Sequence, residues 1–147
     1  MENWVIYGLL ASLFWGSYII SAKVASSKKY FGINPFQVSL FMLIGIAIVF
    51  LVSNLYFNSF QIPKEPKGIF FAILAGVLWA LGMIVSLIAI TKGADVSKLA
   101  PLFNSNTLVA VFLGMILLKE VPSSGIQIIK ILAGSLFIMI GAILVSF

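Results

Sequence analysis

The sequence predicts an all-α integral membrane protein with five transmembrane helices. The chain has 147 residues, of which 62% are hydrophobic and only 9% are charged, and its mean hydropathy is +1.19. A soluble domain carries about a quarter charged residues, so this chain has too few to cover a surface that faces water. Its apolar residues form five segments of bilayer length, and none of them alternates as a strand does. Helix is therefore expected throughout, because a helix satisfies its own backbone hydrogen bonds in lipid.

The five segments are separated by short polar breaks and together make a single transmembrane domain over residues 1–147. Pro35 lies at the start of the second segment, where proline is tolerated in a helix. The break before the third segment, residues 61–68, contains two prolines, two lysines and a glutamate. Pro122 to Gly125 make the last turn. The predicted helices cover about residues 4–25, 36–60, 68–90, 97–118 and 126–147.

The composition also indicates which kinds of chemistry the chain lacks. There is no cysteine and no histidine, so thiol chemistry, haem ligation and the usual zinc sites are excluded. We expect no cofactor, no metal and no catalytic residue, and hence no enzyme. The net charge of +5 comes from scattered lysines, which favours contact with lipid headgroups over nucleic-acid binding. The four acidic residues all lie at segment ends or in loops, which argues against a proton-driven exporter that uses an embedded carboxylate.

The fourth segment contains the main candidate for a binding site. Four hydrogen-bonding side chains follow one another inside it, from Asn104 to Thr107. Such groups are costly in a bilayer unless they face protein or a water-filled cavity. On a helix, Asn104, Ser105 and Thr107 share one broad arc, while Asn106 lies on the other side with Ala110. The first three are expected to face a cavity and Asn106 to bond another helix; the alternative is that all four join helices together.

Two further helix faces could complete this site. On the first segment, Ser12 and Trp15 share a face with two glycines and Lys23, which either snorkels to the surface or faces the cavity. On the third, Trp79 and Met83 follow small residues, a pattern that suits a substrate pocket and a packed seam equally. The residues predicted to bind substrate are Ser12, Trp15, Trp79, Met83, Asn104, Ser105 and Thr107.

Small residues recur along several of the predicted helices. The fifth segment has the cleanest repeat, with Gly134 and Gly141 seven residues apart. Stripes of this kind let helix backbones approach closely in lipid. They fit close packing within one bundle, and in the fifth segment they also fit a dimer seam.

Several short motifs follow in a characteristic order. The first segment carries Trp15-Gly16, the fourth has an early Ala100-Pro101 and ends at Lys119-Glu120, and the fifth is rich in glycine. Together with the five-helix count, this order resembles the EamA-type domain of the drug/metabolite transporter superfamily, over essentially the whole chain. In that family a glycine usually stands where this chain has Lys119.

The resemblance implies a membrane transporter of metabolites, drugs, amino acids or sugars. Typical members have ten helices in two inverted five-helix repeats and work by alternating access, and this chain is similar to one repeat. It would then act as an antiparallel, dual-topology homodimer, or with a second half-size subunit, in the cell (cytoplasmic) membrane. A nearly balanced lysine count permits insertion in both orientations. Four lysines fall on the amino-terminal side and five on the other: Lys64, Lys67, Lys119 and Lys130, against Lys23, Lys28, Lys29, Lys92 and Lys98.

Two alternative functions stay open at this point. Small members of the superfamily also resemble subunits of lipid-linked sugar flippases, which would need a second gene product. A non-transporting membrane scaffold is the other alternative, and it predicts that Asn104 and Thr107 tolerate apolar replacement.

Overall fold

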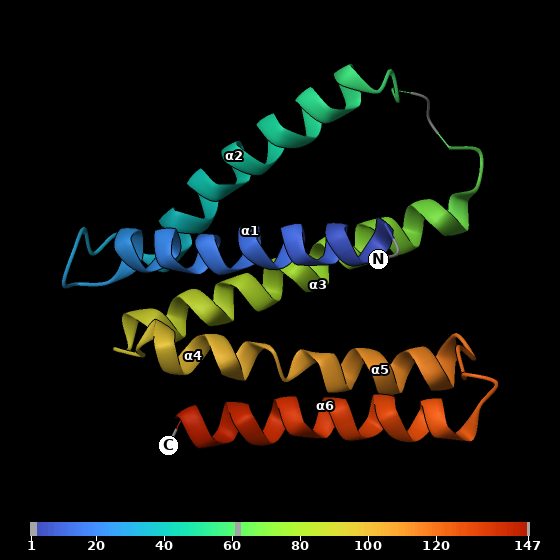
Figure 1. The fold of residues 1–147 in the computed structure, drawn as a ribbon. Helices are drawn as coiled ribbons and strands as arrows, with labels where there is room; N and C mark the ends of the chain where they lie inside the picture. The colour runs from blue at the N-terminus through green and yellow to red at the C-terminus, as the bar shows by residue number, and fades with distance from the viewer. Residues whose placement is uncertain (1–2, 61–62, 147) are drawn as a thin grey trace. The chain divides into compact units, whose positions relative to one another are not determined.

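Helices are the regular structure of this chain, and their bounds agree with five membrane crossings. The computed structural model describes residues 3–60 and 63–146, and this part of the chain contains no strand. Five spans within it are long and apolar enough to cross a membrane, which confirms the predicted all-α fold. The helices are α1 (Asn3–Ser26), α2 (Pro35–Tyr56), α3 (Pro66–Thr91), α4 (Val96–Phe103), α5 (Asn106–Leu117) and α6 (Gly125–Ser146) (Figure 1).

The helix ends differ from the sequence prediction in two places. The predicted second helix extends to residue 60, but α2 ends at Tyr56 because Asn58 takes a left-handed conformation (φ 50°) that turns the chain. The predicted fourth helix is continuous, whereas the structure has α4 and α5 in its place. The predicted end of the fifth helix at Phe147 lies outside the described residues.

Local sequence signals explain where the helices begin and turn. Proline occupies the first position of α2 and of α3, where a missing N–H costs no hydrogen bond. Asn34 caps α2, and its side-chain oxygen accepts a hydrogen bond from the N–H of Phe36 at 3.0 Å. Between α3 and α4 the chain turns at Gly93, whose φ of +99° favours glycine.

The chain divides into two compact units, and the first consists of residues 1–19 and 94–147. Within it, α6 runs back alongside α4 and α5, and it packs more extensively against α4 (Figure 1). The hydroxyl of Ser146, at the end of α6, donates a hydrogen bond to the carbonyl oxygen of Lys98 in α4 at 3.0 Å. Leu99 and Ala142 are buried. The start of α4 and the end of α6 are therefore the firmly packed part of this unit.

The second unit consists of residues 20–93, and its packed part lies where α2 begins and α3 ends. From there α2 and α3 diverge towards the segment that joins them (Figure 1). Most of the large apolar side chains of α2 are exposed, as expected for a helix surrounded by lipid. The buried side chains of the unit are Ala22, Ser26, Val38, Met83, Ser86, Leu87 and Ile90.

The end of α5 contains a strained residue. Lys119 has a φ of +57°, which costs a residue with a Cβ about 1–2 kcal/mol relative to glycine. The N–H groups of Leu118 and Glu120 both donate to the carbonyl oxygen of Gly114 at 3.2 Å, so the turn closes back on α5. The carboxylate of Glu120 lies beside Gly114, 3.5 Å from the position that a Cβ would occupy. Lys119 thus stands where glycine would fit with less strain.

We expect Leu87→Ala to destabilise the protein by roughly 2 kcal/mol, since Leu87 is fully buried and its truncation leaves a cavity. The value lies at the low end for a core leucine because lipid, not water, is the outside medium. Unfolding in mixed detergent micelles measures it. The control is Leu78→Ala, on the same helix but 60% exposed, which should change stability little. Equal effects would show that Leu87 is not in a packed core.

Lys119→Gly should stabilise the protein by about 1 kcal/mol, because glycine adopts a positive φ without strain. The same unfolding measurement applies. Lys92→Gly is the control, since Lys92 ends α3 with a φ of −76° and gains nothing from glycine. A destabilised Lys119→Gly protein would contradict this account of the turn.

Candidate functional site

The polar cluster of the fourth span lies at a break in the helix. Asn104 is the last residue associated with α4, Ser105 follows it, and Asn106 and Thr107 begin α5. The side chains of Asn104 and Asn106 are exposed, and those of Ser105 and Thr107 are half-buried. All four lie near the middle of a 22-residue apolar span, and the expectation that Asn104, Ser105 and Thr107 face a cavity stays a prediction.

The hydrogen-bonding capacity of this cluster is largely unused. The hydroxyl of Ser105 donates to the carbonyl oxygen of Leu102 at 2.7 Å. Among the residues that the structure describes, no hydrogen bond is recorded for the side chains of Asn104, Asn106 or Thr107. Polar groups at such a depth in a bilayer need a partner, which can be water, a bound molecule or another helix. The cluster is thus equipped to bind a ligand or a neighbouring helix.

The structure divides the predicted helix over 97–118 into α4 and α5 at this point, although the two together still make one 22-residue span, and the reason for the division is local. Pro101 has no N–H, and its ring collides with the carbonyl of the residue four positions earlier. The run from Asn104 to Thr107 consists of residues whose side chains compete with the helix for backbone hydrogen bonds. Both signals are present in the sequence, and together they could have predicted the break.

Ser12 and Trp15 lie on an open face of α1. The Ser12 hydroxyl donates to the carbonyl oxygen of Leu9 at 2.9 Å, and its side chain is exposed. Trp15 is 55% exposed and contacts the ring of Tyr18 edge to face, with centroids 6.2 Å apart. A Cβ placed on neighbouring Gly16 would meet nothing within 4 Å. This face is exposed at Ser12 and Trp15, and its role in binding stays a prediction.

Trp79 and Met83 belong to the second unit, and their surroundings differ. Met83 is 7% exposed and lies on α3 near buried Ser86 and Leu87. Of the two alternatives for this residue, its burial favours the packed seam over the substrate pocket. Trp79, one turn earlier, is 38% exposed. The third helix therefore changes from packed to more exposed between these two residues, and a role in binding stays a prediction for both.

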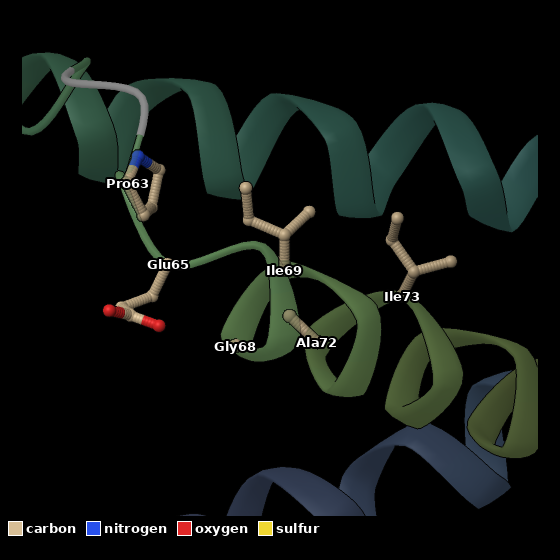
Figure 2. Close-up of a pocket in the computed structure, with 6 residues that line it drawn as sticks. All are labelled: Pro63, Glu65, Gly68, Ile69, Ala72 and Ile73. Carbon is tan, nitrogen blue, oxygen red and sulfur yellow. The ribbon is translucent and has the colours of Figure 1, made fainter.

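An open hollow lies beside the first turns of α3, and none of the predicted site residues lines it. The side chains of Ile69 and Ile73 point towards α2, whereas the carboxylate of Glu65 points away from it (Figure 2). The wall is mainly apolar, and no set of polar groups converges there, so this hollow suits lipid better than a polar substrate. Its lining residues are Pro63, Glu65, Gly68, Ile69, Ala72 and Ile73.

Charged groups in the described residues lie near the helix ends. Lys23 is half-buried in the last turn of α1, where a cation is favoured by the helix dipole. Glu65 and Asp95 precede α3 and α4, and Glu120 follows α5. In residues 3–60 and 63–146, no three His, Cys, Asp or Glu side chains are grouped where they could hold a metal ion. The candidate site is accordingly built from uncharged polar groups.

Comparison with known proteins agrees with the five spans and with the order of the motifs. The model of the EamA-like transporter family matches residues 2–147, nearly the entire chain. No curated protein and no solved structure matches the chain. Members of this family are transporters and not enzymes, and five membrane-spanning helices make this chain a multi-pass membrane protein. The chain therefore belongs to the EamA-like transporter family.

Proposed function

We propose that this chain moves a small polar molecule across the membrane by alternating access, with the broken fourth span as its path. The observation that carries the proposal is the cluster of Asn104, Ser105 and Thr107 at a break inside an apolar span. Transporters commonly bind their substrates near the bilayer midplane, at helices whose backbone is interrupted. Amide and hydroxyl groups can bond to the polar groups of an amino acid, a sugar or another metabolite.

Two other predicted site residues belong to the same unit as this cluster. Ser12 would add a hydroxyl from α1 and Trp15 an apolar wall, and the exposure of Trp15 supports this assignment. Trp79 and Met83 belong to the second unit, and their part in binding stays a prediction. Since the site holds no charge, we expect neutral or zwitterionic substrates to be preferred over ions.

We further propose that two copies insert in opposite orientations and pair as an antiparallel homodimer in the cell membrane. Five spans place the two ends of the chain on opposite faces, so two inverted copies would reproduce the inverted-repeat architecture common among transporters. Four lysines on one side against five on the other give no strong orientation preference. A second half-size subunit of opposite orientation would meet the same geometric demand.

We expect Asn104→Leu to reduce the transport rate at least tenfold. The leucine side chain has the same branched shape as asparagine, but it forms no hydrogen bond with a substrate. Purified protein in liposomes would be screened with radiolabelled neutral amino acids and sugars, and the variant tested with whichever compound the native protein moves. The thermal unfolding temperature of the Asn104→Leu protein should stay near that of the native protein.

The matched control is Asn54→Leu, the same change at an amide that already donates to the carbonyl oxygen of Phe50 at 2.8 Å near the end of α2. It should leave transport within about twofold of native. Native transport rates in Asn104→Leu would show that the polar cluster does not bind the substrate, and would favour the scaffold alternative.

The carboxyl terminus should be found on both sides of the membrane. Reporters joined after Phe147, one active only inside the cell and one only outside, should both give signal in cells that express this chain alone. Signal from one reporter only would exclude the antiparallel homodimer. A partner subunit of opposite orientation would then be required.

A further inference from the structure

The break in the fourth span has the hydrogen-bonding pattern of a hinge. The N–H groups of Ser105, Thr107 and Leu108 each donate to the carbonyl three residues earlier, at 3.1 Å. This is 3₁₀ geometry, which inside a longer helix often marks a point of bending. An α-helical stretch lies on each side of it, α4 before and α5 after.

The break arises from the local sequence and needs no neighbouring helix to hold it open. Pro101 cannot donate to the carbonyl of Ser97, so α4 lacks one helical hydrogen bond in the turn that precedes the break. The amides and hydroxyls from residue 104 to 107 weaken the helical preference of the next turn. Because these causes are local, the break should persist when the surrounding packing changes.

The two halves of the span are held unequally within their unit. α4 packs closely on α6, buries Leu99 and receives the hydrogen bond from Ser146 at the carbonyl of Lys98. α5 also contacts α6, but it has no buried residue, and side chains such as Phe112 and Leu117 are more than 60% exposed. α6 is thus packed more closely against α4 than against α5. We call α4 together with α6 the fixed pair, and α5 the arm.

We propose that Asn104 and Ser105 form a hinge about which α5 swings relative to the fixed α4–α6 pair. Asn104 ends the fixed half and Thr107 lies in the first turn of the swinging half. A molecule that bonds to both side chains joins the two halves and sets the angle between them. This link between binding and bending rests on the proposed function, whereas the hinge itself does not.

The chain contains no cysteine, so spin labels can be placed at chosen pairs of introduced cysteines in the full protein. Leu117→Cys with Leu144→Cys reports on the arm, because Leu117 ends α5 and Leu144 lies near the end of α6. Ser97→Cys with Ile129→Cys reports on the fixed pair. Both separations are roughly 25 Å along the helix axes, given a rise of 1.5 Å per residue. Dilution with unlabelled protein removes distances between copies.

In lipid nanodiscs, pulsed electron paramagnetic resonance should give a distance distribution at least twice as wide for the arm pair as for the fixed pair. Pro101→Ala restores the missing N–H and should narrow the arm distribution towards that of the fixed pair. Pro35→Ala, at the first position of α2, is the matched proline control and should leave both distributions unchanged. Equal widths in the native chain, or a Pro101→Ala chain as broad as native, would overturn the hinge.

A separate measurement tests the link to binding. The compound that the liposome screen identifies should narrow the arm distribution when it is added to the labelled native chain. A broad distribution that this compound does not change would refute the link and leave the hinge standing. Because the width without compound is measured independently of transport, failure of the hinge and failure of the proposed function give different results.

Discussion

Backbone hydrogen bonding in lipid is the constraint on which this structure depends. The bilayer offers no water to unpaired N–H and C=O groups, so each span must satisfy them within its own helix. The hydroxyl groups conform to the same rule. Buried Ser26, Ser86 and Ser135 each donate to a carbonyl three or four residues earlier in their own helix, at 2.7–2.8 Å. Such polar side chains therefore find their hydrogen-bond partner within their own helix and need no neighbouring helix.

The fourth span departs from this rule, and that departure makes it the functional candidate. At its break the helical hydrogen bonds shorten to a three-residue spacing, and three polar side chains, those of Asn104, Asn106 and Thr107, remain without a recorded bond in the described part of the chain. A sequence that only needed to cross the bilayer would have no reason to carry this cost. A binding site would have a use for these groups, because their hydrogen-bonding capacity is not taken up within their own helix.

Packing in this protein is concentrated in few places, which leaves long apolar surfaces open. In the second unit the buried side chains gather where α2 begins and α3 ends, and the rest of α2 is exposed. In the first unit α6 packs more extensively against α4 than against α5. Exposed apolar surface is acceptable in lipid, so it identifies no interface by itself. It is compatible with the second half-size copy that we propose and with the motion that we propose for α5.

The sequence alone determined the fold class, the number of spans, the family resemblance and the polar cluster. These follow from composition and local order, because segment length and hydropathy decide what can cross a bilayer. The break at Asn104 was within reach of the same reasoning through Pro101. The tertiary structure was needed to separate buried Met83 from exposed Trp79, one helical turn away, and to show that α4 packs on α6 more extensively than α5 does. Both distinctions depend on which faces of neighbouring helices meet. Helix periodicity in the sequence shows which residues share a face of one helix, but not which other helix that face contacts.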